Sequence, residues 1–172
     1  MGDTVKDLKE RRSIPKYKAQ IKDRELDPVL EAGTWAANGH GAQSTVMVVL
    51  QDATGIAQLE TLNPRARGKA DTKPFYGAPT VVTVLADTGR PTWVDDGNMV
   101  IANVLNAAYA VGLGSCYVYR AKDLFDGEEG KAVLKKWRRG ENYGGVGHVL
   151  FGYANESLQP KPRKDGYIIK IR

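Results

Sequence analysis

The chain has 172 residues, of which 42% are hydrophobic and 26% are charged, a composition that is typical of folded globular proteins and excludes a disordered one. This length is enough for one substantial core, so we expect a single domain over residues 1–172. The net charge of +5 favours anionic ligands without singling out nucleic acid.

The first half of the chain alternates helical and strand patterns. Residues 4–12 predict a short helix that Pro15 ends, and a second helix begins at Asp23, a favourable N-cap, and runs to residue 36. The runs TVMVVL at 45–50 and TVVTVLA at 80–86 are short, apolar and β-branched, as in buried strands. Residues 55–67 favour a helix up to Asn63-Pro64, and 65–75 favour a polar, basic loop.

The strongest helical pattern covers residues 95–111, with Asp95 or Asp96 as its N-cap and Gly112 at its end. Apolar side chains occupy almost every side of this segment, so we expect it to be buried. In a domain of this size, burial on all sides is easiest when a second subunit covers one face. The pattern therefore favours a homodimer.

The last third of the chain predicts strands at 115–119, 147–153 and 166–171 and short helices at 122–124 and 128–137. The final strand follows a polar, proline-containing tail at 157–164, and we expect it to pair with a sheet edge, either its own or that of a partner subunit. The expected class is therefore α+β, or mixed α/β, with a central sheet flanked by helices.

Cysteine usage and the N-terminus bear on the compartment. Cys116 is the only cysteine, so no disulfide can form within the chain, which fits a reducing cytoplasm. The charged N-terminus lacks the apolar segment of a signal peptide, and no apolar run approaches the ~20 residues that span a bilayer. We therefore expect a cytoplasmic location.

Several familiar reaction centres do not match this sequence. Only His40, His148 and Cys116 could offer nitrogen or sulfur to a metal, and their spacing matches no zinc site, so we expect none. We expect His148 in a strand, His40 in a loop and Cys116 as a buried thiol. The sequence has neither a Gly-x-Ser-x-Gly elbow nor a Walker motif, and the glycines at 112–114 precede a strand, the reverse of the Rossmann order.

Two basic clusters stand near opposite ends of the chain. Arg11-Arg12-Ser13 ends the first predicted helix, and Lys161-Pro162-Arg163 follows the strand at 147–153. Guanidinium and ammonium groups are what a bound phosphate needs, so a fold that joins the two clusters would bind one phosphorylated ligand. Taken alone, Arg11-Arg12-Ser13 is better explained as a helix C-terminus with favourable positive charge. Flavin mononucleotide would suit these parts, with Ser13 for its ribityl hydroxyls and Gln43 for its ring edge.

Five segments, in the same order along nearly the whole chain, resemble the FMN-dependent nitroreductase family. They are Arg11-Arg12-Ser13-Ile14 with Lys16-Tyr17, then 30–43, then Phe75-Tyr76-Gly77-Ala78-Pro79, then Asp96-Gly97 with the helix that closes at 110–116, and finally 146–153 with Lys161-Pro162-Arg163.

The resemblance implies a nitroreductase-like homodimer with two FMN sites at the subunit interface. NADH or NADPH would reduce the flavin, and a nitroaromatic, quinone or similar acceptor would then reoxidise it in a ping-pong exchange, with no side chain assigned as acid or base. The implied FMN contacts are Arg11, Arg12, Ser13, Lys161 and Arg163 at the phosphate and ribityl chain, Asn38, Gly39 and Gln43 from the other subunit, Tyr117, Val118 and Tyr119 along the ring, and Lys73 as a further ring contact.

The chain departs from the family pattern at three places. Pro15 stands where a basic residue is usual, Gly41 where an asparagine is usual, and Ser44-Thr45 where Pro-Trp is usual. The chain is also shorter than typical members, so we expect a segment that covers the site in larger relatives to be absent.

These departures leave open a flavin-binding protein of the same fold without reductase turnover. The positive charge, densest at 135–139, leaves open a basic nucleic-acid-binding domain, although no helix-turn-helix or RNP-like segment supports it.

Overall fold

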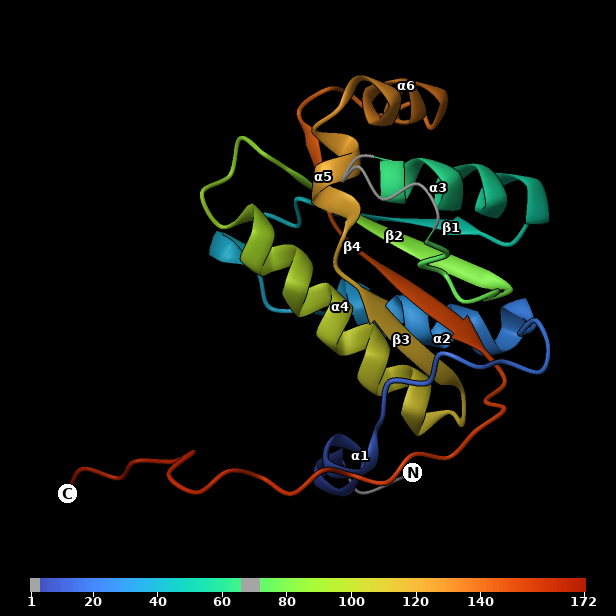
Figure 1. Cartoon of the computed structure of the whole chain (residues 1–172). Coiled ribbons are helices and arrows are strands. Elements are labelled where there is room, and N and C mark those ends of the chain that lie inside the picture. The colour runs from blue at the N-terminus through green and yellow to red at the C-terminus, as the bar shows by residue number, and fades with distance from the viewer. Residues whose placement is uncertain (1–3, 66–71) are drawn as a thin grey trace.

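A four-stranded antiparallel sheet with helices on both faces forms the centre of the computed structural model, which describes residues 4–65 and 72–172 (Figure 1). The strand order is β1-β2-β4-β3, so β1 and β3 are the edge strands. The expected α+β class with a helix-flanked central sheet is confirmed. The strands are β1 (Thr45–Leu50), β2 (Thr80–Asp87), β3 (Gly114–Val118) and β4 (Tyr143–Gly152), and the helices are α1 (Thr4–Glu10), α2 (Asp23–Thr34), the 3-10 turn η1 (Gly39–Gly41), α3 (Ala53–Arg65), α4 (Trp93–Ala110), α5 (Ala121–Phe125) and α6 (Glu128–Lys136).

Two hydrophobic layers fill the space between the sheet and the helices. On the face covered by α2 and α4, the core includes Val82 and Val104, both fully buried. On the face covered by α3, α5 and α6, it includes Leu85, Leu124 and Leu150. Since β2 is an inner strand with both faces buried, its sequence is a continuous apolar run rather than an alternating one. This explains why the strand at 80–86 could be recognised.

Helix α4 packs one side on the sheet and leaves the other side uncovered in the single chain. Val100, Val104 and Ala108, spaced four residues apart, are buried, whereas Met99 and Ala102 are exposed. The helix that we expected to be buried on all sides is therefore buried by its own chain on one face only.

The N-caps predicted for α2 and α4 are wrong by one to four residues, although α2 does begin at Asp23 as expected. Lys22, not Asp23, is the N-cap of α2, and its main-chain N–H donates to Glu25 Oε2 at 3.3 Å. Thr92, not Asp95 or Asp96, is the N-cap of α4, and its carbonyl oxygen accepts from the main-chain N–H of Asp96 at 2.8 Å. Helix α3 also continues beyond Asn63, to residue 65, and most of the loop expected at 65–75 lies outside the described residues.

The strand predicted at 166–171 is not formed in the single chain. Residues after β4 run away from the sheet as an extended tail (Figure 1), and no ladder partner is found for 166–171 among the described residues. The side chains of Tyr167, Ile168, Ile169 and Ile171 are at least 77% exposed. Although the sheet has two edge strands, the path of the tail after β4 leads this β-rich segment away from the sheet of its own chain (Figure 1).

Candidate functional site

The segment that carries Arg11-Arg12-Ser13 lies against the start of β3. Ser13 forms a parallel bridge with Ser115, and the main-chain N–H of Ile14 donates to the carbonyl oxygen of Ser115 at 2.8 Å. Further along, the N–H of Lys18 donates to the carbonyl oxygen of Tyr153 at 2.8 Å, just after β4. The basic N-terminal cluster is thus held at a fixed place on the edge of the sheet.

Unpaired polar atoms gather at this place. Arg11 Nη1, Arg12 Nε and Ser115 Oγ are buried and have no hydrogen-bond partner within the described part of the chain. Arg12 Nη1, in contrast, donates to the carbonyl oxygens of Lys9 and Arg11 at 2.7 and 2.6 Å, at the end of α1. Burial, and after it the adjacent Arg12 charge, lowers the pKa of the Arg11 guanidinium. Donors left unsatisfied in a buried place are costly unless a ligand accepts from them.

A hollow of about 210 Å³ opens beside Arg11 and Arg12. Leu158 of the tail and Glu156 also line it. Glu156 Oε1 is buried without a partner in the described residues, while its Oε2 lies 3.5 Å from Lys16 Nζ. Two arginines make this hollow suitable for an anion, and the Glu156 carboxylate opposes one.

Residues 117–119, which are predicted to lie along the flavin ring, differ in the direction of their side chains. The Tyr117 hydroxyl donates to Asn98 Oδ1 at 3.4 Å, and its ring lies over Gly147, where a Cβ would meet Tyr117 Cε2 at 2.3 Å. Tyr119 is 55% exposed, whereas Val118 is buried in the core beneath α5, so only its main chain could reach a ligand. A hollow of about 230 Å³ lies beside Tyr117 and Tyr119.

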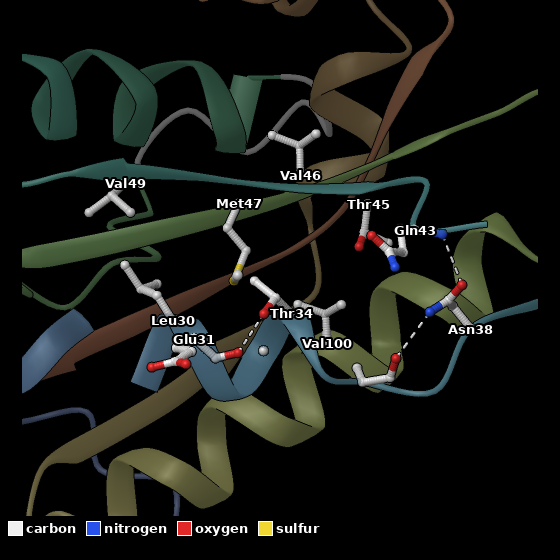
Figure 2. A pocket seen from close by; sticks show the side chains of 12 residues that line it. Leu30, Glu31, Thr34, Asn38, Gln43, Thr45, Val46, Met47, Val49 and Val100 are labelled. Carbon is white, nitrogen blue, oxygen red and sulfur yellow. Dashed lines mark hydrogen bonds between the residues drawn. The ribbon is translucent and has the colours of Figure 1, made fainter. Parts of the chain in front are cut away.

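The predicted contacts at 38–43 form a closed loop between α2 and β1 (Figure 2). Asn38 Oδ1 accepts from the main-chain N–H of Gln43 at 2.9 Å, and Asn38 Nδ2 donates to the Ala36 carbonyl oxygen at 3.1 Å. His40, Gly41 and Gln43 have positive φ of 55°, 64° and 48°. Asn38 and Gln43 line a cavity of about 420 Å³ between α2 and β1. The loop conformation is thus held by the Asn38 side chain and is unusual for His40 and Gln43.

The loop and the arginine cluster lie at opposite ends of α4. Gly39 contacts Asp96 in the first turns of α4, whereas the Tyr109 hydroxyl, near its other end, donates to Glu10 Oε2 of α1 at 3.2 Å. Asp96 and Tyr109 are 13 residues apart, which corresponds to roughly 20 Å along a helix. A single chain therefore does not bring Asn38, Gly39 and Gln43 together with Arg11.

Three predicted basic contacts stand apart from the arginine cluster. Lys73 is exposed, ahead of β2. Lys161 and Arg163 are exposed on the tail, beyond Leu158, which does line the hollow beside Arg11. The N-terminal cluster and β3 are brought together as expected, but the C-terminal basic residues are not joined to them in the single chain.

Two buried polar residues, Asp96 and His148, were not among the predicted flavin contacts. Asp96 is 3% exposed and accepts from the main-chain N–H of Gly39 at 2.8 Å. Its signal in the sequence is an acidic residue next to Gly97 at the start of a mainly apolar helix. His148 is fully buried in β4, as expected for a strand histidine, with Nδ1 2.9 Å from Thr83 Oγ1, and burial lowers its pKa to about 3.

Residues 4–65 and 72–172 contain neither a metal-binding cluster nor a membrane-spanning helix. Within these ranges no three His, Cys, Asp or Glu side chains gather as a metal site would require. No helix in the same ranges is long and apolar enough to cross a bilayer.

Comparison with known proteins places the chain in a family. The nitroreductase family model matches residues 8–122. A nitroreductase from Bacteroides fragilis NCTC 9343, solved with bound FMN, is 26% identical and has a TM-score of 0.89 over 100% of both chains. A nitroreductase from Desulfitobacterium hafniense DCB-2, also solved with bound FMN, is 21% identical with a TM-score of 0.88 over 100% of both chains, a likeness of fold.

A curated relative from Methanothermobacter thermautotrophicus, provisionally assigned as an NADH dehydrogenase/NAD(P)H nitroreductase, is 24% identical over 132 residues. That match covers 73% of this chain and 66% of the relative, just under two thirds of the relative's length. Since the family model spans well over half of the chain and the fold agrees throughout, the protein belongs to the nitroreductase family.

Proposed function

We propose that this chain is a single-domain, FMN-dependent NAD(P)H oxidoreductase that reduces nitroaromatic, quinone or similar electron-poor acceptors. The observation that supports it most is the group of buried, unpaired donors Arg11 Nη1, Arg12 Nε and Ser115 Oγ at the edge of β3. Membership of a family in which relatives have been solved with FMN gives these donors a natural acceptor.

The phosphate of FMN fits this donor set. Guanidinium forks bind phosphate through charge-assisted hydrogen bonds, and Arg11 and Arg12 lie where such bonds are missing. Ser13, exposed beside them, suits the phosphate or the ribityl hydroxyls. The tail passes this hollow at Leu158, so Lys161 and Arg163, a few residues further along, would add to the phosphate contacts.

The ring of FMN would lie along the outer edge of β3. The Tyr117 and Tyr119 side chains flank a hollow there, and Val118 would contribute its main chain. Lys73 would be a further contact at the ring. Flavin in this setting supplies the hydride chemistry, accepting from NADH or NADPH and passing reducing equivalents to the acceptor. Positive charge near the flavin would stabilise the anion that develops on its ring upon reduction, and no side chain is assigned as acid or base.

A homodimer would complete each site. The uncovered side of α4 carries Met99 and Ala102, which a second copy can bury. Two α4 helices related by a two-fold axis and running antiparallel place the start of one beside the end of the other. Such an arrangement would bring the 38–43 loop of one subunit to the Arg11 cluster of its partner, which a single chain does not do.

The tail supports the same assembly. Residues 166–171 have a strand-like sequence and are exposed, and β1 is an edge strand. We propose that this segment pairs with a sheet edge of the partner subunit, since unpaired edge strands readily accept a further strand.

A visible absorption spectrum tests the proposal directly. The purified protein is incubated with FMN, unbound flavin is removed, and NADH or NADPH is added under anaerobic conditions. Retained flavin bands that bleach with a nicotinamide would support the reductase, and steady-state double-reciprocal lines should then be parallel. A protein that retains no FMN would overturn the proposal.

A second candidate is a flavin-binding protein of this fold without reductase turnover. The side chain of Lys16, the basic residue next to Pro15, is 71% exposed, and its Nζ lies 3.5 Å from Glu156 Oε2. Lys16 thus forms a surface ion pair and does not take the place of the basic residue that is usual at position 15. Flavin that stays bound but does not bleach with either nicotinamide would favour this candidate.

A further inference from the structure

We propose that Asp96 is a positioning residue, which fixes the 38–43 loop and through it the flavin contacts that this loop offers to the partner subunit. The inference rests on the proposed function. Asp96 is itself placed far from the Arg11 cluster of its own chain, at the opposite end of α4. Asp96 is only 3% exposed and both of its carboxylate oxygens are engaged within the chain, so it would act through the loop and not by touching the flavin.

Both oxygens of the buried Asp96 carboxylate accept hydrogen bonds, one from the loop and one from the N-cap residue of α4. Oδ1 accepts from the main-chain N–H of Gly39 at 2.8 Å, and Oδ2 accepts from Thr92 Oγ1 at 3.0 Å. No Lys or Arg among the described residues forms an ion pair with it. A buried carboxylate is costly without hydrogen bonds, so these two donors and the positive end of α4 are what hold its charge.

The first turns of α4, which carry Asp96, are packed tightly on the sheet. Gly97, the next residue, lies so close to β4 that a Cβ there would be 2.5 Å from Val146 Cγ2. The first turns of α4 are therefore fixed on the sheet, and Asp96 with them. On the loop side, a Cβ on Gly39 would be 2.4 Å from Thr92 Oγ1, so the loop fits against α4 only because residue 39 has no side chain.

The loop beyond Gly39 depends on being held. His40 and Gln43 are non-glycine residues with positive φ, a conformation that persists only when surrounding contacts determine it. Those contacts are the Asn38 bond to Gln43 and the Asp96 bond to Gly39. Without the carboxylate, the Gly39 N–H loses its partner and the loop is free to relax, which displaces Gln43.

Three variants separate positioning from general stability. Asp96→Ala removes both acceptors, and we expect the dissociation constant of FMN to rise about tenfold or more. Asp96→Asn retains Oδ1 for Gly39 and can donate to Thr92, so it should restore most of the affinity. The matched control is Asp95→Asn, because Asp95 is an exposed acidic neighbour in the same turn, and it should bind FMN as the wild type does. FMN fluorescence titration of each full-length protein gives these values.

Mixed dimers test whether the loop acts across the interface. A dimer of one Asp96→Ala subunit and one Arg11→Ala subunit should keep one intact site and bind one FMN tightly. A dimer of a wild-type subunit and a subunit that carries both substitutions should have no intact site. If instead the first dimer binds no FMN tightly and the second binds one, the loop serves the site of its own chain, which would overturn the proposal.

The outcomes also separate this inference from the function on which it rests. Wild-type protein that binds no FMN overturns both. Wild-type protein that binds FMN, with an Asp96→Ala variant of equal affinity, overturns the positioning role alone. If Asp96→Ala does not fold, Gly39→Ala takes its place, because the added Cβ forces the loop from Thr92 while Asp96 remains. An unchanged FMN affinity in that variant would overturn the role as well.

Discussion

The main-chain N–H of Ile14 donates to the carbonyl oxygen of Ser115 at 2.8 Å, which joins the N-terminal segment to the start of strand β3. This bond connects two parts of the chain that are far apart in sequence. It fixes Arg11 and Arg12 beside an edge strand, with buried donors that have no partner in the described chain. The placement of positive charge at this edge is the basis of the first two predictions.

Replacing Arg11 should separate ligand binding from stability. We expect Arg11→Ala to raise the dissociation constant of FMN by about tenfold or more, because a charge-assisted hydrogen bond to phosphate is lost. The free energy of unfolding without FMN should stay the same or rise, since Arg11 Nη1 is buried unpaired. FMN titration and urea unfolding measure the two. Lys6→Ala, which removes an exposed charge from α1, is the control. Unchanged FMN affinity in Arg11→Ala would contradict the phosphate site.

Neutralising Glu156 should strengthen FMN binding. Its carboxylate lines the same hollow as Arg11 and opposes an anion there. We expect Glu156→Gln to lower the dissociation constant of FMN by about fivefold at low salt, and by less at high salt. Titration at two salt concentrations measures both values, with the exposed Glu129→Gln as control. Weaker binding in Glu156→Gln would mean that the carboxylate supports the site and that its repulsion is not the controlling effect.

The uncovered side of α4 should be an interface. Ala102 is exposed in the single chain, and Ala102→Arg would place a charge in the proposed contact between two α4 helices. We expect this variant to be monomeric by light scattering and to lose FMN. Ala132→Arg introduces the same side chain at an exposed site on α6 and should leave the mass unchanged. A dimeric Ala102→Arg protein would exclude this face as the interface.

His148 should make the fold less stable in mild acid. Burial lowers its pKa to about 3, whereas the unfolded chain has the usual value near 6.5. Between these values the unfolded state binds a proton that the native state does not, so stability falls as the pH decreases from about 6.5 toward 3. His148→Leu should reduce the loss between pH 7 and pH 5 by about 2 kcal/mol, measured by urea unfolding. His40→Asn, at an exposed position, should leave the loss of stability between pH 7 and pH 5 unchanged. If His148→Leu loses as much stability as the wild type over this range, His148 is not its source.

The parts of the fold that depend on local pattern could be predicted from the sequence. The apolar run of β2 reflects burial on both faces, and the helical pattern of α4 reflects its packing on the sheet. The N-cap of α4 could not be predicted, because Asp95 and Asp96 are favourable capping residues, whereas the helix begins earlier, after a Thr92 whose side chain makes no capping bond. The strand expected at 166–171 is not formed in the single chain, because pairing depends on the path of the tail, which leads away from the sheet after β4 (Figure 1).

The candidate site was likewise predictable in part. Arg11 and Ser115 belong to recognisable segments, and the fold brings them together. The Asn38 and Gln43 loop was expected to come from another subunit, and this stays a prediction, since the single chain shows only that the loop and Arg11 lie at opposite ends of α4. The exposure of Lys161 and Arg163 could not be read from their residue types, because it depends on the path of the tail after β4.

The placement of the loop and the arginine cluster at opposite ends of α4 has a kinetic consequence. Under the dimer proposal, a newly made chain carries half of each of two sites and a whole one of neither. Uptake of FMN by dilute apo-protein would then follow second-order kinetics in protein concentration, with subunit encounter as the slow step. Dilution alone would release the flavin, so the occupancy of the sites would report the abundance of the protein as well as that of its cofactor.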